Sequence, residues 1–157
     1  MNEASVALAA RLVLATVLAG SAIAKMRSRA AVRQQVETLV SARAAPVVAA
    51  MLPVTELGVA ALLVVLWTPL PGVVAVILLA LFTVVLLRAQ ARRVPCLCFG
   101  ASSLDTPVGP AAVVRNGVLA ALAVLAIGTP SGASFGATLV AGAAFAIAAG
   151  LAVRAAR

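Results

Sequence analysis

The sequence predicts an all-α protein, a polytopic bundle of transmembrane helices. Hydrophobic residues make up 64% of the 157 residues and charged residues only 10%, and the mean hydropathy is +1.19. A soluble domain has about a quarter of its residues charged, so this chain could not cover its core with a solvated surface. The apolar residues also gather in runs long enough to cross a hydrocarbon core of about 30 Å as helices. We therefore expect residues 1–157 to form a single transmembrane domain that lies in the lipid bilayer.

Five membrane spans are predicted, at about residues 4–24, 45–67, 70–87, 110–128 and 133–153. The first span lacks a basic segment before it, and its positive charges follow it, so we expect it to be retained as a helix instead of cleaved as a signal peptide. Residues 28–44 place Val32, Val36 and Val40 at helical spacing, with Ser28 at the start and Pro46 just beyond the end. This pattern predicts a short amphipathic helix, lying either at the membrane interface or as a solvated linker.

The basic residues indicate the orientation of these spans. Ten of the twelve fall on one side of a five-span arrangement, and the turns on the other side contain none. By the positive-inside rule, the N-terminus is outside and the C-terminus is cytoplasmic, as expected for a multi-pass protein of the inner cell membrane. These ten residues are Lys25, Arg27, Arg29, Arg33, Arg43, Arg88, Arg92, Arg93, Arg154 and Arg157.

Composition also restricts the chemistry. The net charge of +8 belongs to this topological pattern, so no nucleic-acid partner is expected. The chain has no histidine and only two cysteines. A zinc site with several ligands, a four-cysteine iron–sulfur cluster and a histidine-ligated haem are therefore not expected, and the sequence predicts no cofactor and no metal. What remains is thiol chemistry or charge pairing.

The two cysteines, Cys96 and Cys98, lie one residue apart in the irregular segment between the third and fourth spans. A disulfide between them would close a very small and strained ring that is easily reduced. Such a pair suits a catalytic or electron-shuttling dithiol, although inert or palmitoylated thiols are the alternative.

Three further residues are costly inside a membrane helix. Glu56 lies well inside the second span, three residues after Pro53, and Arg115 with Asn116 lies early in the fourth. A lone charge near the centre of a membrane helix costs roughly 2.5–3.5 kcal/mol, so these residues should face the bundle interior, where Glu56 and Arg115 could form an ion pair. They either hold helices together or line a polar pocket beneath the cysteines. Arg11, nearer the outer end of the first span, is expected to extend its side chain outward to the interface.

Four segments carry a resemblance: residues 20–25 (Gly-Ser-Ala-Ile-Ala-Lys), residues 52–57 (Leu-Pro-Val-Thr-Glu-Leu), residues 96–100 (Cys-Leu-Cys-Phe-Gly) and the Arg115-Asn116 pair. Together they resemble the methylamine utilisation protein MauE family, which is similar to the DoxX-like membrane proteins. The resemblance implies a four-helix core, to which this chain adds a fifth C-terminal helix. It also implies a thioredoxin-fold partner in disulfide chemistry, with Cys96 and Cys98 as the redox pair and Glu56, Arg115 and Asn116 as a supporting polar core.

The leading hypothesis is therefore a membrane thiol–disulfide redox protein, a possible oxidoreductase. The alternative is a non-catalytic accessory or scaffold subunit of a larger membrane protein complex, and a small transporter built on Glu56 and Arg115 is a third reading. One conflict remains, because the topology places the cysteines on the cytoplasmic side whereas disulfides form outside. Movement of the cysteine segment or a re-entrant path would reconcile the two.

Overall fold

The computed structural model describes residues 3–91 and 110–128, and within them the chain forms five helices and no strand. The prediction of an all-α membrane bundle is confirmed. The predicted fifth span, 133–153, lies outside the described residues. The helices are α1 (Glu3–Arg27), α2 (Arg29–Leu39), α3 (Ala45–Val65), α4 (Leu70–Ala91) and α5 (Pro110–Leu125).

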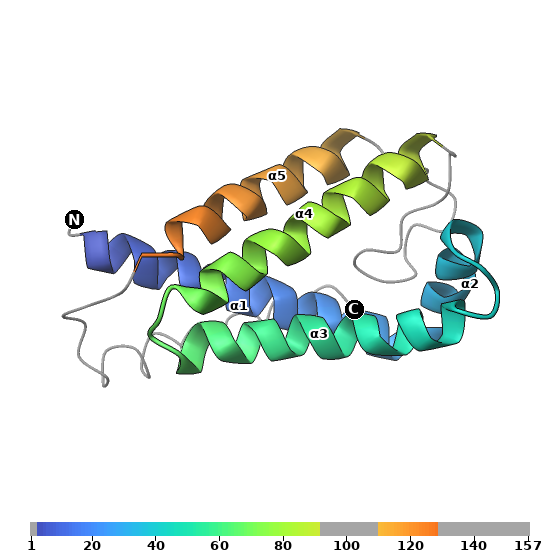
Figure 1. The fold of residues 1–157 in the computed structure, drawn as a ribbon, viewed down its shortest axis with the longest axis horizontal. Helices are drawn as coiled ribbons and strands as arrows, with labels where there is room; N and C mark the ends of the chain where they lie inside the picture. The colour runs from blue at the N-terminus through green and yellow to red at the C-terminus, as the bar shows by residue number, and fades with distance from the viewer. Residues whose placement is uncertain (1–2, 92–109, 129–157) are drawn as a thin grey trace, which may run out of the picture.

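The four longer helices run alternately up and down (Figure 1). α1 runs toward α2, α3 returns beside α1, α4 runs back toward the α2 end, and α5 returns beside α4. We call the end that carries α2 the α2 end, and the end with the short connection between α3 and α4 the Thr68 end. At the Thr68 end only four residues separate Val65 from Leu70, so α3 and α4 are forced to be antiparallel neighbours.

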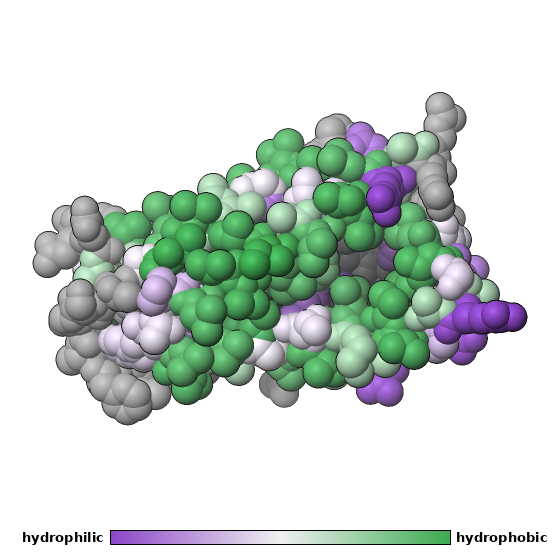
Figure 2. Space-filling view, in the orientation of Figure 1, coloured by the Kyte–Doolittle hydropathy of each residue, from purple (hydrophilic) through white to green (hydrophobic). Residues whose placement is uncertain are grey.

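Three helices are long and apolar enough to cross a membrane: residues 4–27, 45–65 and 70–91. α3 and α4 are hydrophobic all round, as expected for helices with lipid on one side and protein on the other. α5 is also apolar but has only 16 residues. Figure 2 shows the result on one face, where hydrophobic residues cover the middle of the bundle and the most hydrophilic ones gather toward the α2 end.

The predicted amphipathic segment forms α2, a separate helix of 11 residues. Its start follows Ser28 as expected, although the Ser28 side chain accepts no capping hydrogen bond from the first turn. Val32 is buried, while Arg33 pairs with Glu37 one turn later on the exposed face at 2.9 Å. The apolar face of α2 therefore closes this end of the bundle, and its charged face points away.

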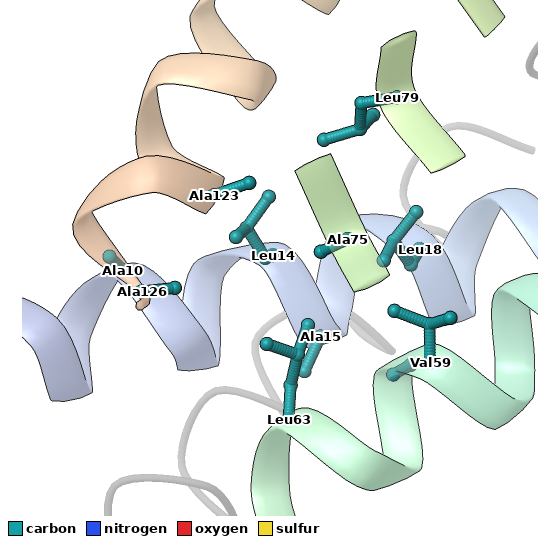
Figure 3. Close-up of a cluster of buried hydrophobic side chains, with 11 residues drawn as sticks. Ala10, Leu14, Ala15, Leu18, Val59, Leu63, Ala75, Leu79, Ala123 and Ala126 are labelled. Atoms are coloured by element: carbon teal, nitrogen blue, oxygen red, sulfur yellow. The ribbon is translucent and has the colours of Figure 1, made fainter. Parts of the chain in front are cut away.

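The core lies where α1 meets the other three long helices (Figure 3). Small side chains allow close approach there: Ala10, Ala15, Ala75 and Ala123 are all buried. Gly72 marks the tightest approach, because a Cβ atom at this position would lie 2.7 Å from the backbone nitrogen of Ile127. A side chain at position 72 would therefore force the start of α4 away from the residues that follow α5. The remaining buried members of this cluster are Leu14, Leu18, Val59, Ala60, Leu63, Leu79 and Ala126.

Candidate functional site

The most unusual feature inside the bundle is a buried ion pair between Lys25 of α1 and Glu56 of α3. The Lys25 ammonium group donates to Glu56 Oε1 and, at 2.7 Å, to the hydroxyl oxygen of Ser21. Ser21 also donates to Glu56 Oε1, at 3.5 Å. Glu56 is fully buried and Lys25 is 8% exposed. Because a charge is costly within the bilayer, each of these two residues depends on the other to be tolerated there.

The local sequence explains this arrangement. Ser21 and Lys25 are four residues apart, so they lie on the same face of α1 one turn from each other. α1 continues to Arg27, beyond the predicted end at residue 24. Lys25 is therefore part of the helix. On α4, the ring of Phe82 lies 5.4 Å from the Lys25 nitrogen, a cation–π contact that further stabilises the ammonium group.

Asn116 of α5 forms a second buried polar contact, with α4. Its amide nitrogen donates to the carbonyl oxygen of Leu79 at 2.9 Å and to the hydroxyl of Thr83 at 2.7 Å. Thr83 in turn donates to the same carbonyl oxygen at 2.9 Å. The asparagine therefore fixes the register of α5 against α4 at the level of the ion pair.

A cavity of about 420 Å³ lies beside these contacts. All five described helices contribute to its wall, which is mostly apolar. Its polar lining residues are Ser21, Lys25, Gln35, Thr55, Glu56, Arg115 and Asn116. The structure thus places the three predicted polar residues, Glu56, Arg115 and Asn116, around a single cavity. Within the described ranges, no group of three or more His, Cys, Asp or Glu side chains could hold a metal ion.

The ion partner of Glu56 differs from the expected one. The sequence predicts Arg115 as a possible partner, but Glu56 pairs with Lys25, a member of the basic cluster that follows the first span. The basic residues that follow Lys25, Arg27 and Arg29, suggested that its side chain also faces the membrane surface. One signal for an inward Lys25 was present in the sequence. Ser21 and Lys25 are four residues apart, so a helix that includes both places these two polar side chains on one face.

The prediction for Arg11 was wrong. Its side chain does not extend outward but is buried, with 2% exposure. The guanidinium group donates to the carbonyl oxygens of Leu66 at 2.7 Å, of Thr68, and of Ala126 at 2.9 Å. These carbonyls lie at or just beyond the C-terminal ends of α3 and α5, where helices leave acceptors without partners and carry partial negative charge. Arg11 therefore joins three segments of chain at the Thr68 end.

The two cysteines, Cys96 and Cys98, lie outside the described residues. The helices that flank them are described, however. α4 ends at Ala91 and α5 begins at Pro110, both at the α2 end (Figure 1). Ala89, close to the end of α4, and Arg115, in the second turn of α5, both line the cavity. The segment that contains the cysteines is thus attached on both sides to helices that form the cavity wall.

Comparison with known proteins gives one positive finding. No curated protein and no solved structure matches the chain significantly. The model of one family, described as methylamine utilisation protein MauE, matches residues 3–129. This range covers all five described helices, the ion pair, Arg11 and the cysteine segment. The chain is therefore a membrane protein that belongs to the MauE family.

Proposed function

We propose that this protein is a membrane thiol–disulfide redox protein, in which Cys96 and Cys98 exchange a disulfide with a thioredoxin-fold partner. The observation that carries the proposal is the position of the only two cysteines of the chain, between two helix ends that flank a buried polar cluster. Cys96 is five residues beyond Ala91, and five extended residues reach about 18 Å at most. The reacting thiols are therefore tethered to the α2 end of the bundle.

The exchange needs no other reactant. A thiolate of the Cys96/Cys98 pair attacks one sulfur of the partner's disulfide, and a mixed disulfide forms as the other partner sulfur leaves as a thiolate, which takes up a proton. The second cysteine of the pair then attacks the mixed disulfide. The partner gains two electrons and two protons and becomes a dithiol, and Cys96 and Cys98 become a disulfide. The reverse sequence oxidises the partner.

The buried polar residues support this site in the proposal. Glu56, with Lys25, joins α3 to α1. Asn116 joins α5 to α4, the two helices that follow and precede the cysteine segment in the chain. Arg115 adds a positive charge to the cavity wall close to the start of α5. Positive charge near a thiol favours its reactive thiolate form.

The orientation of the protein is part of the proposal. Arg27, Arg29, Arg33 and Arg88 all lie at the α2 end, in α1, α2 or the last turn of α4. By the positive-inside rule, we assign this end to the cytoplasmic side of the inner membrane and the N-terminus to the outside. The cysteine segment would then begin and end on the cytoplasmic side.

Thiol labelling tests both the redox role and the side. Intact cells and inverted vesicles are treated with permeant and impermeant maleimides, with and without prior reduction. The proposal expects labelling that requires reduction and is lost in the Cys96→Ser, Cys98→Ser double variant, which should also abolish disulfide exchange with the partner. Thiols that label without reduction and do not change with oxidant would contradict it. A stoichiometric membrane complex that survives loss of both cysteines would instead identify an accessory subunit.

A further inference from the structure

The cavity extends from the core of the bundle to its α2 end. Its wall includes Leu18, a member of the core cluster on α1, and the apolar face of α2 with Val32, Val36 and Leu39. Most of the wall is apolar, and an apolar cavity does not attract water but does take up apolar molecules. The wall between the core and α2 therefore favours a hydrocarbon occupant.

Part of the same wall belongs to the surface that faces lipid. Val48 of α3 and Leu81 and Val85 of α4 line the cavity and are 37%, 59% and 47% exposed. Because these are apolar side chains on membrane-spanning helices, we expect hydrocarbon against their exposed sides. α3 and α4 also diverge from the Thr68 end toward the α2 end (Figure 1). A lipid chain can therefore reach the cavity directly from the bilayer.

Two arginines lie beside this wall at the α2 end. Arg88 of α4 is exposed and lies three residues after the cavity-lining Val85, so the two share one face of the helix. Arg43 is exposed in the connection between α2 and α3, and the residues Val40 and Val48 on either side of it line the cavity. Within the described ranges, neither arginine has a hydrogen-bond or ion-pair partner.

The charges at this end favour an anionic head group. Lys25 is paired with Glu56, and Arg115 also has an interaction partner, so we assign the ligand to the two arginines. Glu37, the only other carboxylate among the described side chains, is paired within α2. A phosphate group accepts two parallel hydrogen bonds from a guanidinium group, and basic sites between membrane helices bind anionic lipid head groups. A head group that also carries a cation would be repelled by the same arginines.

We propose that the cavity binds an anionic phospholipid, with one acyl chain along the apolar wall and the phosphate group on Arg43 and Arg88. The cavity volume of about 420 Å³ is within the range of small-molecule pockets, and the second acyl chain would stay in the bilayer. The site does not use the cysteines, so it is independent of the redox proposal.

Photo-crosslinking of the full chain in lipid nanodiscs tests this inference. Two probes are compared at the same mole fraction, phosphatidylglycerol and phosphatidylcholine, each with a diazirine at the end of one acyl chain. Adducts are located by mass spectrometry of peptides. We expect the phosphatidylglycerol probe to label cavity-lining residues at least about fivefold more than the phosphatidylcholine probe. An excess of soluble glycerol phosphate should not reduce this labelling, because it has no acyl chain.

Neutral substitutions of arginine test the head-group contact. Arg43→Gln and Arg88→Gln should each reduce labelling by the phosphatidylglycerol probe about fivefold. Arg27→Gln is the matched control, since it removes the same charge from the same end. Arg27 lies two residues after the cavity-lining Lys25, so it projects from another side of α1, and its loss should change labelling less than about twofold.

Two neighbouring valines test the position of the acyl chain. Val85 and Val84 of α4 are exposed to similar extents, 47% and 48%, but only Val85 lines the cavity. Val85→Trp should reduce labelling at least about tenfold by filling the opening, whereas Val84→Trp should leave it unchanged. Labelling should persist in the Cys96→Ser, Cys98→Ser variant, in which the redox proposal expects disulfide exchange to be lost.

Four results would overturn the inference. Equal labelling by the two probes would show that the head-group charge is not recognised. A loss in Arg27→Gln as large as in Arg88→Gln would show only a general attraction to this end of the bundle. Full competition by glycerol phosphate would identify a site for a free phosphate ester. An absence of adducts on cavity-lining residues would leave the two arginines to an acidic protein surface or to another part of the chain.

Discussion

Removing the positive partner of the buried ion pair is the sharpest test of the site geometry. In Lys25→Met the side chain keeps its apolar length but loses its charge, and Glu56 keeps only the hydrogen bond from Ser21, at 3.5 Å. Because Glu56 is fully buried, the orphaned carboxylate remains away from water. Breaking one side of a buried pair costs about 3–5 kcal/mol, and we expect a loss of that size in the free energy of unfolding.

The double variant Lys25→Met, Glu56→Gln should recover much of this loss, because it leaves no unpaired charge in the bundle. The exposed Arg33–Glu37 pair of α2 is the matched control, since it has the same charges and an N–O distance of 2.9 Å. Arg33→Met should cost no more than about 0.5 kcal/mol. The two pairs differ in burial, and the buried one joins two helices whereas the exposed one lies within α2.

The measurement is reversible unfolding in mixed micelles of a mild detergent and dodecyl sulfate, followed by far-ultraviolet circular dichroism. All variants are compared at one detergent concentration and pH. The reasoning fails if Lys25→Met costs no more than Arg33→Met. It also fails if the double variant is less stable than Lys25→Met, because the two residues would then not compensate each other.

The remaining predictions use the same unfolding assay. Arg11→Met should lose about 3 kcal/mol or more, because three carbonyl oxygens lose a charged donor, and Arg11→Lys should restore only part of this since one ammonium group cannot reach all three. A full rescue by lysine would contradict the bridging role. Gly72→Ala should cost about 1–3 kcal/mol through its contact with the backbone of Ile127, whereas Gly117→Ala, whose Cβ would meet nothing within 4 Å, should be neutral or stabilising by up to about 1 kcal/mol. Equal effects at the two glycines would refute the close approach of α4 and α5. Asn116→Leu should lower the free energy of unfolding by about 0.6 kcal/mol, and by at most about 1.7 kcal/mol, because Thr83 keeps its hydrogen bond to the carbonyl oxygen of Leu79 in its own helix. A much larger loss would show that Asn116 has a further essential partner.

The position of the helices was largely predictable from the sequence. Four of the five predicted spans have counterparts in α1, α3, α4 and α5, and the amphipathic segment has one in α2. The differences are at helix ends: α1 continues to Arg27 and α4 to Ala91, each beyond the apolar run that marked it. Helix ends were less predictable because charged side chains beyond an apolar run can either leave the helix or continue it, depending on what they contact.

The site was predictable only in part. Glu56, Arg115 and Asn116 were identified because polar side chains are conspicuous in apolar helices. The partners of these residues were not identified, because the helices around them are apolar on every side. A helix that is hydrophobic all round has no stripe to show which face is inside, so the sequence pointed to Arg115 and not to Lys25 as the partner of Glu56.

By itself, the sequence determined that this protein is a membrane bundle, which segments are helical and where the positive charges gather. These properties depend on the hydropathy of local segments and on charge order along the chain. Only the tertiary structure decided that Lys25 turns inward to Glu56, that Arg11 joins the ends of α3 and α5, and that all five described helices enclose a cavity. These features depend on how each helix is rotated and how the helices cross. Small residues such as Gly72 decide this by allowing close backbone contact, and the hydrophobic pattern of the sequence does not show it.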